Sequence, residues 1–314
     1  MERNEIGEVR DTAQKNRRKP GKWILQGMLL LAVGIMLLPL CMLAADSLMG
    51  RQELLETCGG VLAGTKETVR FRFFPSYPTL QAYVRLLLDS PEYFTAFWNS
   101  IFQTVGILLG QLVVAVPAAW SFARFRFPGK RFLWFLYMLL MILPFQVTMV
   151  SGYLVLHTLR LLDTRWAVIL PGIFSTLPVF ILTKTFAGIS GELIEAAQMD
   201  GAGSLRIFLQ IGLPLGKSGI FSIFILGFLE YWNAIEQPMT YLRTKSLWPL
   251  PLYLPQMGNQ EISTVFAASI VTLLPAVLCF FYGQEYLEQG IVASGVGKQR
   301  NVRTDLHNNN GQFE

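Results

Sequence analysis

Charged side chains are scarce in this sequence. Asp, Glu, Lys and Arg make up 15% of the 314 residues, whereas 52% of the residues are hydrophobic. A soluble domain carries about 25% charged residues. The apolar residues are also gathered into long blocks, and a block of about 18 or more indicates a membrane-spanning helix. The shortage of charged residues and the grouping of the apolar residues into long blocks therefore indicate an integral membrane protein.

Histidine and cysteine are also few. The two histidines, His157 and His307, have no partners at metal-ligand spacing, and the three cysteines, Cys41, Cys58 and Cys279, lie far apart. This pattern argues against a metal site and a disulfide framework. The sequence has no Gly-x-Ser-x-Gly motif and no pair of catalytic carboxylates, so we predict that the chain is not an enzyme.

A nucleotide-binding loop is missing as well. The segment 212–218 reads GLPLGKS and resembles the phosphate-binding motif G-x-x-x-x-G-K-[ST], but it has three residues between its glycines instead of four. Pro214 lies in its middle, and no strand precedes it, as that motif requires. We therefore expect no cofactor on this chain and expect ATP, if used, to be bound by a partner subunit.

Six apolar blocks are present, each bounded by charged or turn residues. They predict an all-α integral membrane protein with six transmembrane helices, at 23–45, 99–120, 132–156, 166–186, 218–235 and 264–283. The first block follows a basic stretch, but it is longer than the 7–15 apolar residues of a cleaved signal peptide. We expect it to be an uncleaved span.

Lysine and arginine predict the orientation of these spans. They concentrate in the N-terminal tail 1–22, in the segment 121–131 and in the C-terminal tail 291–314. Six spans place these segments on one side, together with the loop 187–217, and the positive-inside rule makes that side cytoplasmic. The net charge of +5 is then explained by topology rather than by nucleic acid.

The remaining connections then lie outside the cell. We predict an extracytoplasmic segment 46–98 that forms a small ordered cap, and shorter outer segments at 157–165 and 236–263. The transport core would be 99–290, with five spans.

The loop from Ser190 to Leu215 predicts two short amphipathic helices. Ser190 can cap the first and Ser204 the second, because short hydroxyl side chains favour helix starts. Gly201 between them predicts a left-handed turn, and Gly212 and Pro214 are expected to end the second helix after Ile211. The small side chains of Ala196 and Ala197 share a face that permits close approach to a partner, although a helix lying on lipid headgroups is the alternative.

The fixed positions of this loop resemble the EAA loop of binding-protein-dependent ABC importer permeases. They are Glu195, Ala196, Ala197, Gly201, Ile211, Leu213 and Pro214. Further stretches resemble the carbohydrate branch, in particular the maltose-type second permease: 122–130, 144–147, 161–164, 231–233 and 290–297. The resemblance covers roughly 20–298.

The resemblance implies a type I ABC importer permease fold in a prokaryotic cell membrane, with both termini cytoplasmic. It implies a second permease subunit in a heterodimer, an ABC ATPase dimer and an extracytoplasmic solute-binding protein as partners, and a sugar or related solute. The residues that it assigns to ATPase coupling are Glu195, Ala196, Ala197, Asp200, Gly201, Ile211, Leu213 and Pro214.

Polar residues within spans suggest the solute path, because they are costly in lipid and often functional. Glu230, Asn233 and Glu236 are spaced to follow one side of a helix, with the aromatic Trp232 beside them. Their alternative reading is an interfacial belt of aromatic and charged residues. Weaker candidates from other spans are Gln146, Thr148, Gln103 and Gln111.

Two other features bear on architecture and mechanism. Gly106 and Gly110 form a G-x-x-x-G pattern that predicts close helix packing. An ion-coupled secondary transporter is the alternative function, but it predicts inverted repeats and charges near the membrane midplane, and the sequence shows no such repeat. A membrane receptor would need a large appended domain, for which the sequence offers no candidate.

Overall fold

The computed structural model describes residues 20–62, 74–257 and 262–291, and these ranges contain helices and no strand. Most of the predicted cytoplasmic tails, 1–19 and 292–314, lies outside the described residues. The chain divides into two compact units: Met1–Ala82 with Ile262–Ile270, and Tyr83–Glu261 with Val271–Glu314.

The first unit is built on α2 (Pro20–Asp46) and α3 (Arg51–Leu62) and includes the start of α16 (Ile262–Ile291). Met49, Leu54 and Ile262 form its small buried core. An 18-residue window within Leu25–Asp46 has a mean hydropathy of 2.6, and none of that window is buried. A helix that is apolar on all sides and uncovered suits lipid, which agrees with the predicted first span.

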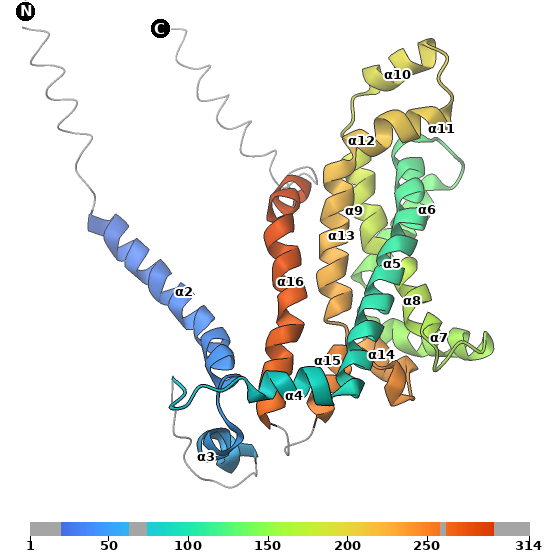
Figure 1. Cartoon of the computed structure of the whole chain (residues 1–314). Helices are drawn as coiled ribbons and strands as arrows, with labels where there is room; N and C mark the ends of the chain where they lie inside the picture. Colours follow the sequence, from blue (N-terminus) through green and yellow to red (C-terminus); the bar gives the residue numbers. More distant parts are fainter. Residues whose placement is uncertain (1–19, 63–73, 258–261, 292–314) are drawn as a thin grey trace, which may run out of the picture. The chain divides into compact units, whose positions relative to one another are not determined.

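The second unit is organised around α5 (Pro91–Arg124), a helix of 34 residues. It packs against α8 (Trp166–Ile173), α9 (Thr176–Ala187) and α13 (Lys217–Trp232) (Figure 1). The buried core between these helices includes Trp120, Val179, Leu182, Phe186 and Ile223. The α5 helix extends beyond the predicted 99–120 at both ends. Its earlier start is explained by Pro91 and Glu92, which suit the first turn of a helix.

Gly106 and Gly110 of α5 allow this helix to pack closely against α8, and we call this contact the α5–α8 seam. A Cβ atom built on Gly110 would lie 2.3 Å from Cγ1 of Ile173, and one on Gly106 would lie 3.3 Å from Cδ1 of Ile169. A Cβ atom on Gly172 of α8 would lie 2.9 Å from the side chain of Ile107 of α5. The predicted close packing at the G-x-x-x-G pattern is therefore confirmed, and its partner is α8.

The predicted continuous span 132–156 is wrong. It consists of α6 (Lys130–Ile142) and α7 (Phe145–Thr158), which meet at an angle of 108°. Pro144 causes the break: it lacks an N–H group and forces an extended conformation on the residue before it. Leu143 accordingly has φ −67° and ψ 125°.

Four described helical stretches are long and apolar enough to cross a membrane, one of them being α8 and α9 together (Trp166–Ala187), and the number rises to six if each bent helix pair counts as one span. The second bent pair joins Ser204–Leu215 to α13 at 68°. The other elements are short: α4 (Gln81–Asp89), α14 (Glu236–Tyr241), α15 (Leu250–Tyr253) and the 3₁₀ turns Lys245–Leu247 and Leu254–Gln256.

Candidate functional site: a helical loop and a polar recess

The loop between α9 and α13 forms a helical hairpin at one end of the second unit (Figure 1). It comprises α10 (Gly191–Met199), α11 (Ser204–Ile207), a π-helical turn (Phe208–Gly212) and α12 (Leu213–Leu215). Gly201 has φ +79°, with nothing within 4 Å of the position of a Cβ. The predicted left-handed turn is confirmed, and it is the backbone angle rather than packing that favours glycine there.

Three local predictions about this loop are corrected. Ser190 stands at the helix start but makes no side-chain capping bond, and Gly203 rather than Ser204 precedes α11. Helical structure continues through Gly212 and Pro214 to Leu215, because a proline is tolerated in the first turn of a helix, here α12.

Gly212 and Gly216 instead allow the chain to lie against aromatic rings of the core. A Cβ atom on Gly212 would lie 2.7 Å from Trp120, and one on Gly216 would lie 2.3 Å from Phe186. The glycines thus anchor the base of the loop on α5 and α9.

The hairpin has an inner and an outer face. Ile194, Ala197 and Ala202 pack against the core of the second unit, as do Ile211 and Leu213 further on. The outer face is solvent-exposed in this chain and comprises Leu193, Glu195, Ala196, Met199, Asp200, Gly201 and Pro214. The prediction that Ala196 and Ala197 present one joint surface is therefore wrong: Ala196 faces outward, and Ala197 supports it from inside.

Arg124, the last residue of α5, ties the base of the hairpin to the basic segment 121–131. Its Nη2 atom donates hydrogen bonds to the carbonyl oxygens of Phe186 (2.6 Å) and Ile189 (2.5 Å). Its guanidinium group also lies 5.7 Å from the centre of the Trp120 ring. The basic segment and the hairpin therefore share one end of the unit, a link that sequence reasoning missed.

Asp163 joins two loops at the opposite end. Its carboxylate accepts hydrogen bonds from the backbone N–H groups of Arg243 and Thr244, both at 2.8 Å, and from the Thr244 hydroxyl. Its own N–H donates to the carbonyl oxygen of Tyr241. These bonds hold the segment 157–165 against 236–263, and they hold Asp163 at φ +59°, where few non-glycine residues occur.

We call the hydrogen bonds between Asp163 and the segment Tyr241–Thr244 the Asp163 clamp. The stability of this contact is expected to depend on pH. Hydrogen bonds from the Thr244 hydroxyl and backbone lower the pKa of Asp163 below its ordinary 3.8. A depressed pKa gives stability that is present above 3.8 and is lost as the pH falls through the lower, folded-state value. We expect the amide protection factors of Arg243 and Thr244 to fall in that window.

Asp163→Asn should lower this protection at neutral pH and remove its dependence on pH, and Thr244→Val should have a smaller effect. Hydrogen exchange followed by mass spectrometry measures both. A wild-type protection factor that stays constant below pH 3.8 would show that the clamp contributes nothing.

The predicted polar spiral on the fifth span is only partly present. The α13 helix ends at Trp232, so Glu236 begins a separate helix, α14, and does not continue the face of Glu230. Asn233 contributes to the break, because its amide donates to the carbonyl oxygen of Leu229 in place of a continuing helix bond.

Trp232 is not available to a solute. It is 2% exposed, its indole N–H donates to the carbonyl oxygen of Thr272, and its ring stacks on Phe228. Its assignment to the solute path is therefore corrected to a packing role. The apolar bulk of the indole favours burial once its single N–H group has a partner.

Gln146 and Glu236 are brought together from different elements. The Gln146 amide donates to both carboxylate oxygens of Glu236 at 2.9 Å, which joins α7 to α14. Thr148, one turn along α7, donates its hydroxyl to the carbonyl oxygen of Phe145 in its own helix. Gln103 is buried and donates to the carbonyl oxygen of Leu247.

Asn99 of α5 was not singled out from the sequence. It donates to the carbonyl oxygens of Ser246 and Trp248 and accepts a hydrogen bond from Arg165. In the sequence, the available signal for such a residue is an amide side chain at the start of an apolar block.

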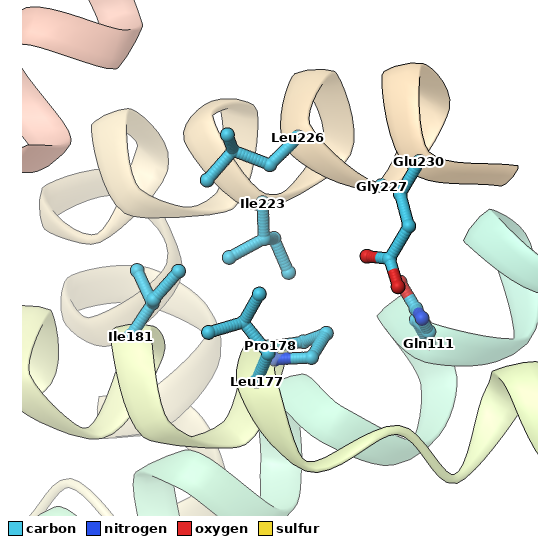
Figure 2. Close-up of a pocket in the computed structure, with 8 residues that line it drawn as sticks. All are labelled: Gln111, Leu177, Pro178, Ile181, Ile223, Leu226, Gly227 and Glu230. Carbon is cyan, nitrogen blue, oxygen red and sulfur yellow. The ribbon is translucent and has the colours of Figure 1, made fainter. Parts of the chain in front are cut away.

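Figure 2 shows a recess between α5, α9 and α13. Six of its lining residues are apolar or glycine, and two are polar: Gln111 from α5 and Glu230 from the last turn of α13. The carboxylate of Glu230 points toward the amide of Gln111 in this view. In the described ranges, no three His, Cys, Asp or Glu side chains lie together as a metal site would require.

The fold and the hairpin define a class: a multi-span, all-helical membrane component with an exposed helical loop at one end. The family described as "Binding-protein-dependent transport system inner membrane component" matches residues 111–293. The chain belongs to this family. It is a permease subunit of an inner-membrane transport system, and it is not an enzyme.

Individual relatives agree with the family. The chain is 30% identical to the "Arabinooligosaccharides transport system permease protein AraQ" of Halalkalibacterium halodurans, over 71% of this chain and 81% of the relative. It is 28% identical to the "sn-glycerol-3-phosphate transport system permease protein UgpE" of Escherichia coli O1:K1, over 85% of this chain and 94% of the relative.

Solved structures share the fold. A chain in the crystal structure of a bacterial ABC transporter involved in import of the acidic polysaccharide alginate has a TM-score of 0.72 at 23% identity. That match covers 86% of this chain and 98% of the other. A second alginate transporter structure, in complex with its periplasmic protein, has a TM-score of 0.60. The chain therefore has a type I permease-like fold.

Proposed function

We propose that this chain forms half of the translocation pathway of an ATP-driven importer for a sugar or related solute. A second permease subunit completes the pathway, an ABC ATPase dimer that binds the ATP docks beneath, and an extracytoplasmic solute-binding protein delivers the solute. The observation that carries the proposal is the α10–α12 hairpin, which has an exposed outer face and an inner face fixed to the helix core.

The proposed topology has six spans, with both bent helix pairs counted as one span each and both termini cytoplasmic. Its domains are those predicted above: the tail 1–22, the first span 23–45, the outer segment 46–98, the core 99–290 and the tail 291–314. Two contacts support the sidedness of the core. Arg124 binds the base of the hairpin at one end, and Asp163 joins two predicted outer segments at the other.

The hairpin would couple ATP binding to movement of the spans. Glu195, Ala196, Asp200 and Gly201 would contact the ATPase, since they are exposed. Ala197, Ile211 and Leu213 would transmit force, because they pack against α5, α9 and α13 through the same core. Pro214 is exposed at the base of the hairpin and completes the proposed coupling segment. Because the hairpin is fixed to the core in this way, a movement of the ATPase that displaces the hairpin would also displace the spans.

The solute path would run along the outer half of α13 and the bend after α6. Glu230, Asn233, Gln146 and Thr148 supply its polar groups, and all four are exposed or half-buried in this chain. A carbohydrate suits such a surface, because hydroxyl groups both donate and accept hydrogen bonds. The functions of the relatives, transport of arabinooligosaccharides and sn-glycerol-3-phosphate, support a sugar or sugar-like solute.

Reconstitution into proteoliposomes tests the proposed function. The four components are this chain, its sister permease, the ATPase and the binding protein, with ATP enclosed in the lumen that corresponds to the cytoplasm. We expect solute uptake that is lost when any one component or ATP is omitted. Uptake driven by an ion gradient without ATP would instead support the secondary-transporter alternative.

A further inference from the structure

The recess of Figure 2 is small and bears only hydrogen-bond acceptors that are free to bind. Its internal volume is about 10 Å³, which is the room that one water-sized group needs. Its lining residues are Gln111, Leu177, Pro178, Ile181, Ile223, Leu226, Gly227 and Glu230. A hydroxyl group fits this space, whereas a phosphate or carboxylate group is larger.

Gln111 is fixed with its amide oxygen unpaired. The side chain is 1% exposed, and its Nε2 atom donates to the carbonyl oxygen of Gly172 at 2.8 Å and to the Tyr231 hydroxyl at 3.1 Å. The Gly172 carbonyl only accepts, so the orientation of the amide is determined. Among the described residues, the Oε1 atom has no hydrogen-bond partner. A buried acceptor without a donor is unfavourable, which indicates an occupant that donates.

Glu230 presents a second acceptor to the same recess. It lies in the last turn of α13, at the end of the span away from the hairpin. None of the eight lining residues is basic. An acidic side chain in a span is favoured where it faces a water-filled path rather than lipid.

The outer half of the proposed path carries a second acid. Glu236 is exposed, and its carboxylate accepts hydrogen bonds from the amide of Gln146 at the mouth of the path. A phosphate or carboxylate group of an anionic solute would therefore meet two carboxylates, and acceptor oxygens cannot hydrogen-bond to one another. A neutral polyol meets only acceptors that its hydroxyl groups can satisfy.

We propose that the transported solute is an uncharged polyhydroxyl compound, a neutral carbohydrate, one of whose hydroxyl groups enters this recess and donates to Gln111 Oε1 and Glu230. This inference rests on the proposed function. It places the solute with neutral oligosaccharides rather than with phosphate esters or acidic polysaccharides.

The test uses the complete transporter in proteoliposomes with internal ATP. The probes are arabinotriose and maltotriose as neutral solutes, and sn-glycerol 3-phosphate and an alginate trisaccharide as anionic ones. We expect uptake of a neutral probe only. Uptake of an anionic probe would overturn the inference while leaving the proposed function intact, and uptake of no probe at all would sink both.

Variants of Glu230 test the contact itself. Loss of a hydrogen bond to a charged group weakens binding about tenfold or more, so Glu230→Leu should raise the KM for the neutral probe by that factor. Glu230→Gln keeps an acceptor oxygen and should stay within about threefold of the wild type. Phe224→Leu, on the same helix but outside the recess, is the matched control.

Assembly is checked by co-purification of the ATPase with each variant. If Glu230→Leu fails to assemble, Glu230→Asp takes its place, with a smaller expected rise in KM because the shorter side chain retracts the carboxylate. An unchanged KM in the assembled variant would overturn the inference. So would uptake that depends on external Na⁺, because a cation would then occupy the recess.

Discussion

Gly201→Val is expected to impair ATP-driven uptake strongly while the chain still inserts and folds in the membrane. Gly201 has φ +79°. A left-handed conformation costs an ordinary residue about 1–2 kcal/mol, and a β-branched residue is a genuine outlier there. The loop relieves this strain by changing the direction of α10, which moves the exposed Glu195 and Ala196 away from the ATPase. Uptake should fall by about tenfold or more.

Two matched variants separate the backbone angle from the added side chain. Gly203, two residues later, has φ −70° and open space around its Cβ position, so Gly203→Ala should leave uptake unchanged. Gly201→Asn should retain most of the activity, because asparagine tolerates the left-handed region. Normal co-purification of the ATPase with Gly201→Val would argue against a docking role for the hairpin.

Gly110→Val is expected to lower the stability of the folded protein. The new Cβ would lie 2.3 Å from Cγ1 and 2.4 Å from Cδ1 of Ile173, where α5 meets α8. Overpacking of this kind costs about 1–3 kcal/mol. The gain in helix propensity on replacing glycine is under about 1 kcal/mol and does not offset it. The midpoint temperature of detergent-solubilised protein should fall.

The matched control is Gly34→Ala in α2, whose Cβ would have nothing within 4 Å, and it should be neutral or slightly stabilising. Ile173→Ala in the Gly110→Val background should recover part of the lost stability, because it removes the side-chain atoms that the new valine would overlap. Thermal unfolding followed by size-exclusion chromatography measures all of these variants. Equal stability of Gly110→Val and the wild type would mean that the α5–α8 seam is not as close as described.

The sequence predicted the parts of this protein that depend on composition and backbone chemistry. Long apolar blocks identified the helices, Gly201 identified the left-handed turn, and Gly106 with Gly110 identified a packing seam. These features depend on a residue's own size and flexibility, so no knowledge of its neighbours is needed. The loop pattern from Glu195 to Pro214 further indicated the family that the comparisons established.

Features that depend on neighbours were mispredicted or missed. The bend at Pro144 was hidden inside a hydrophobic block, because hydropathy does not distinguish a straight span from a broken one. Trp232 was predicted to contact the solute, but its indole N–H donates a hydrogen bond to the carbonyl oxygen of Thr272, forty residues away in the sequence. The clamp at Asp163 and the anchor at Arg124 likewise join segments that are distant in sequence.

Site-specific crosslinking tests the central claim, that the hairpin docks a separate ATPase, most directly. A photo-crosslinking amino acid would replace exposed Ala196 on α10, and in a second variant Met239 on α14, which is 65% exposed at the opposite end of the unit. In the assembled transporter we expect Ala196 to crosslink to the ATPase and Met239 not to. A crosslink to the ATPase from Met239, or only lipid adducts from Ala196, would contradict the account.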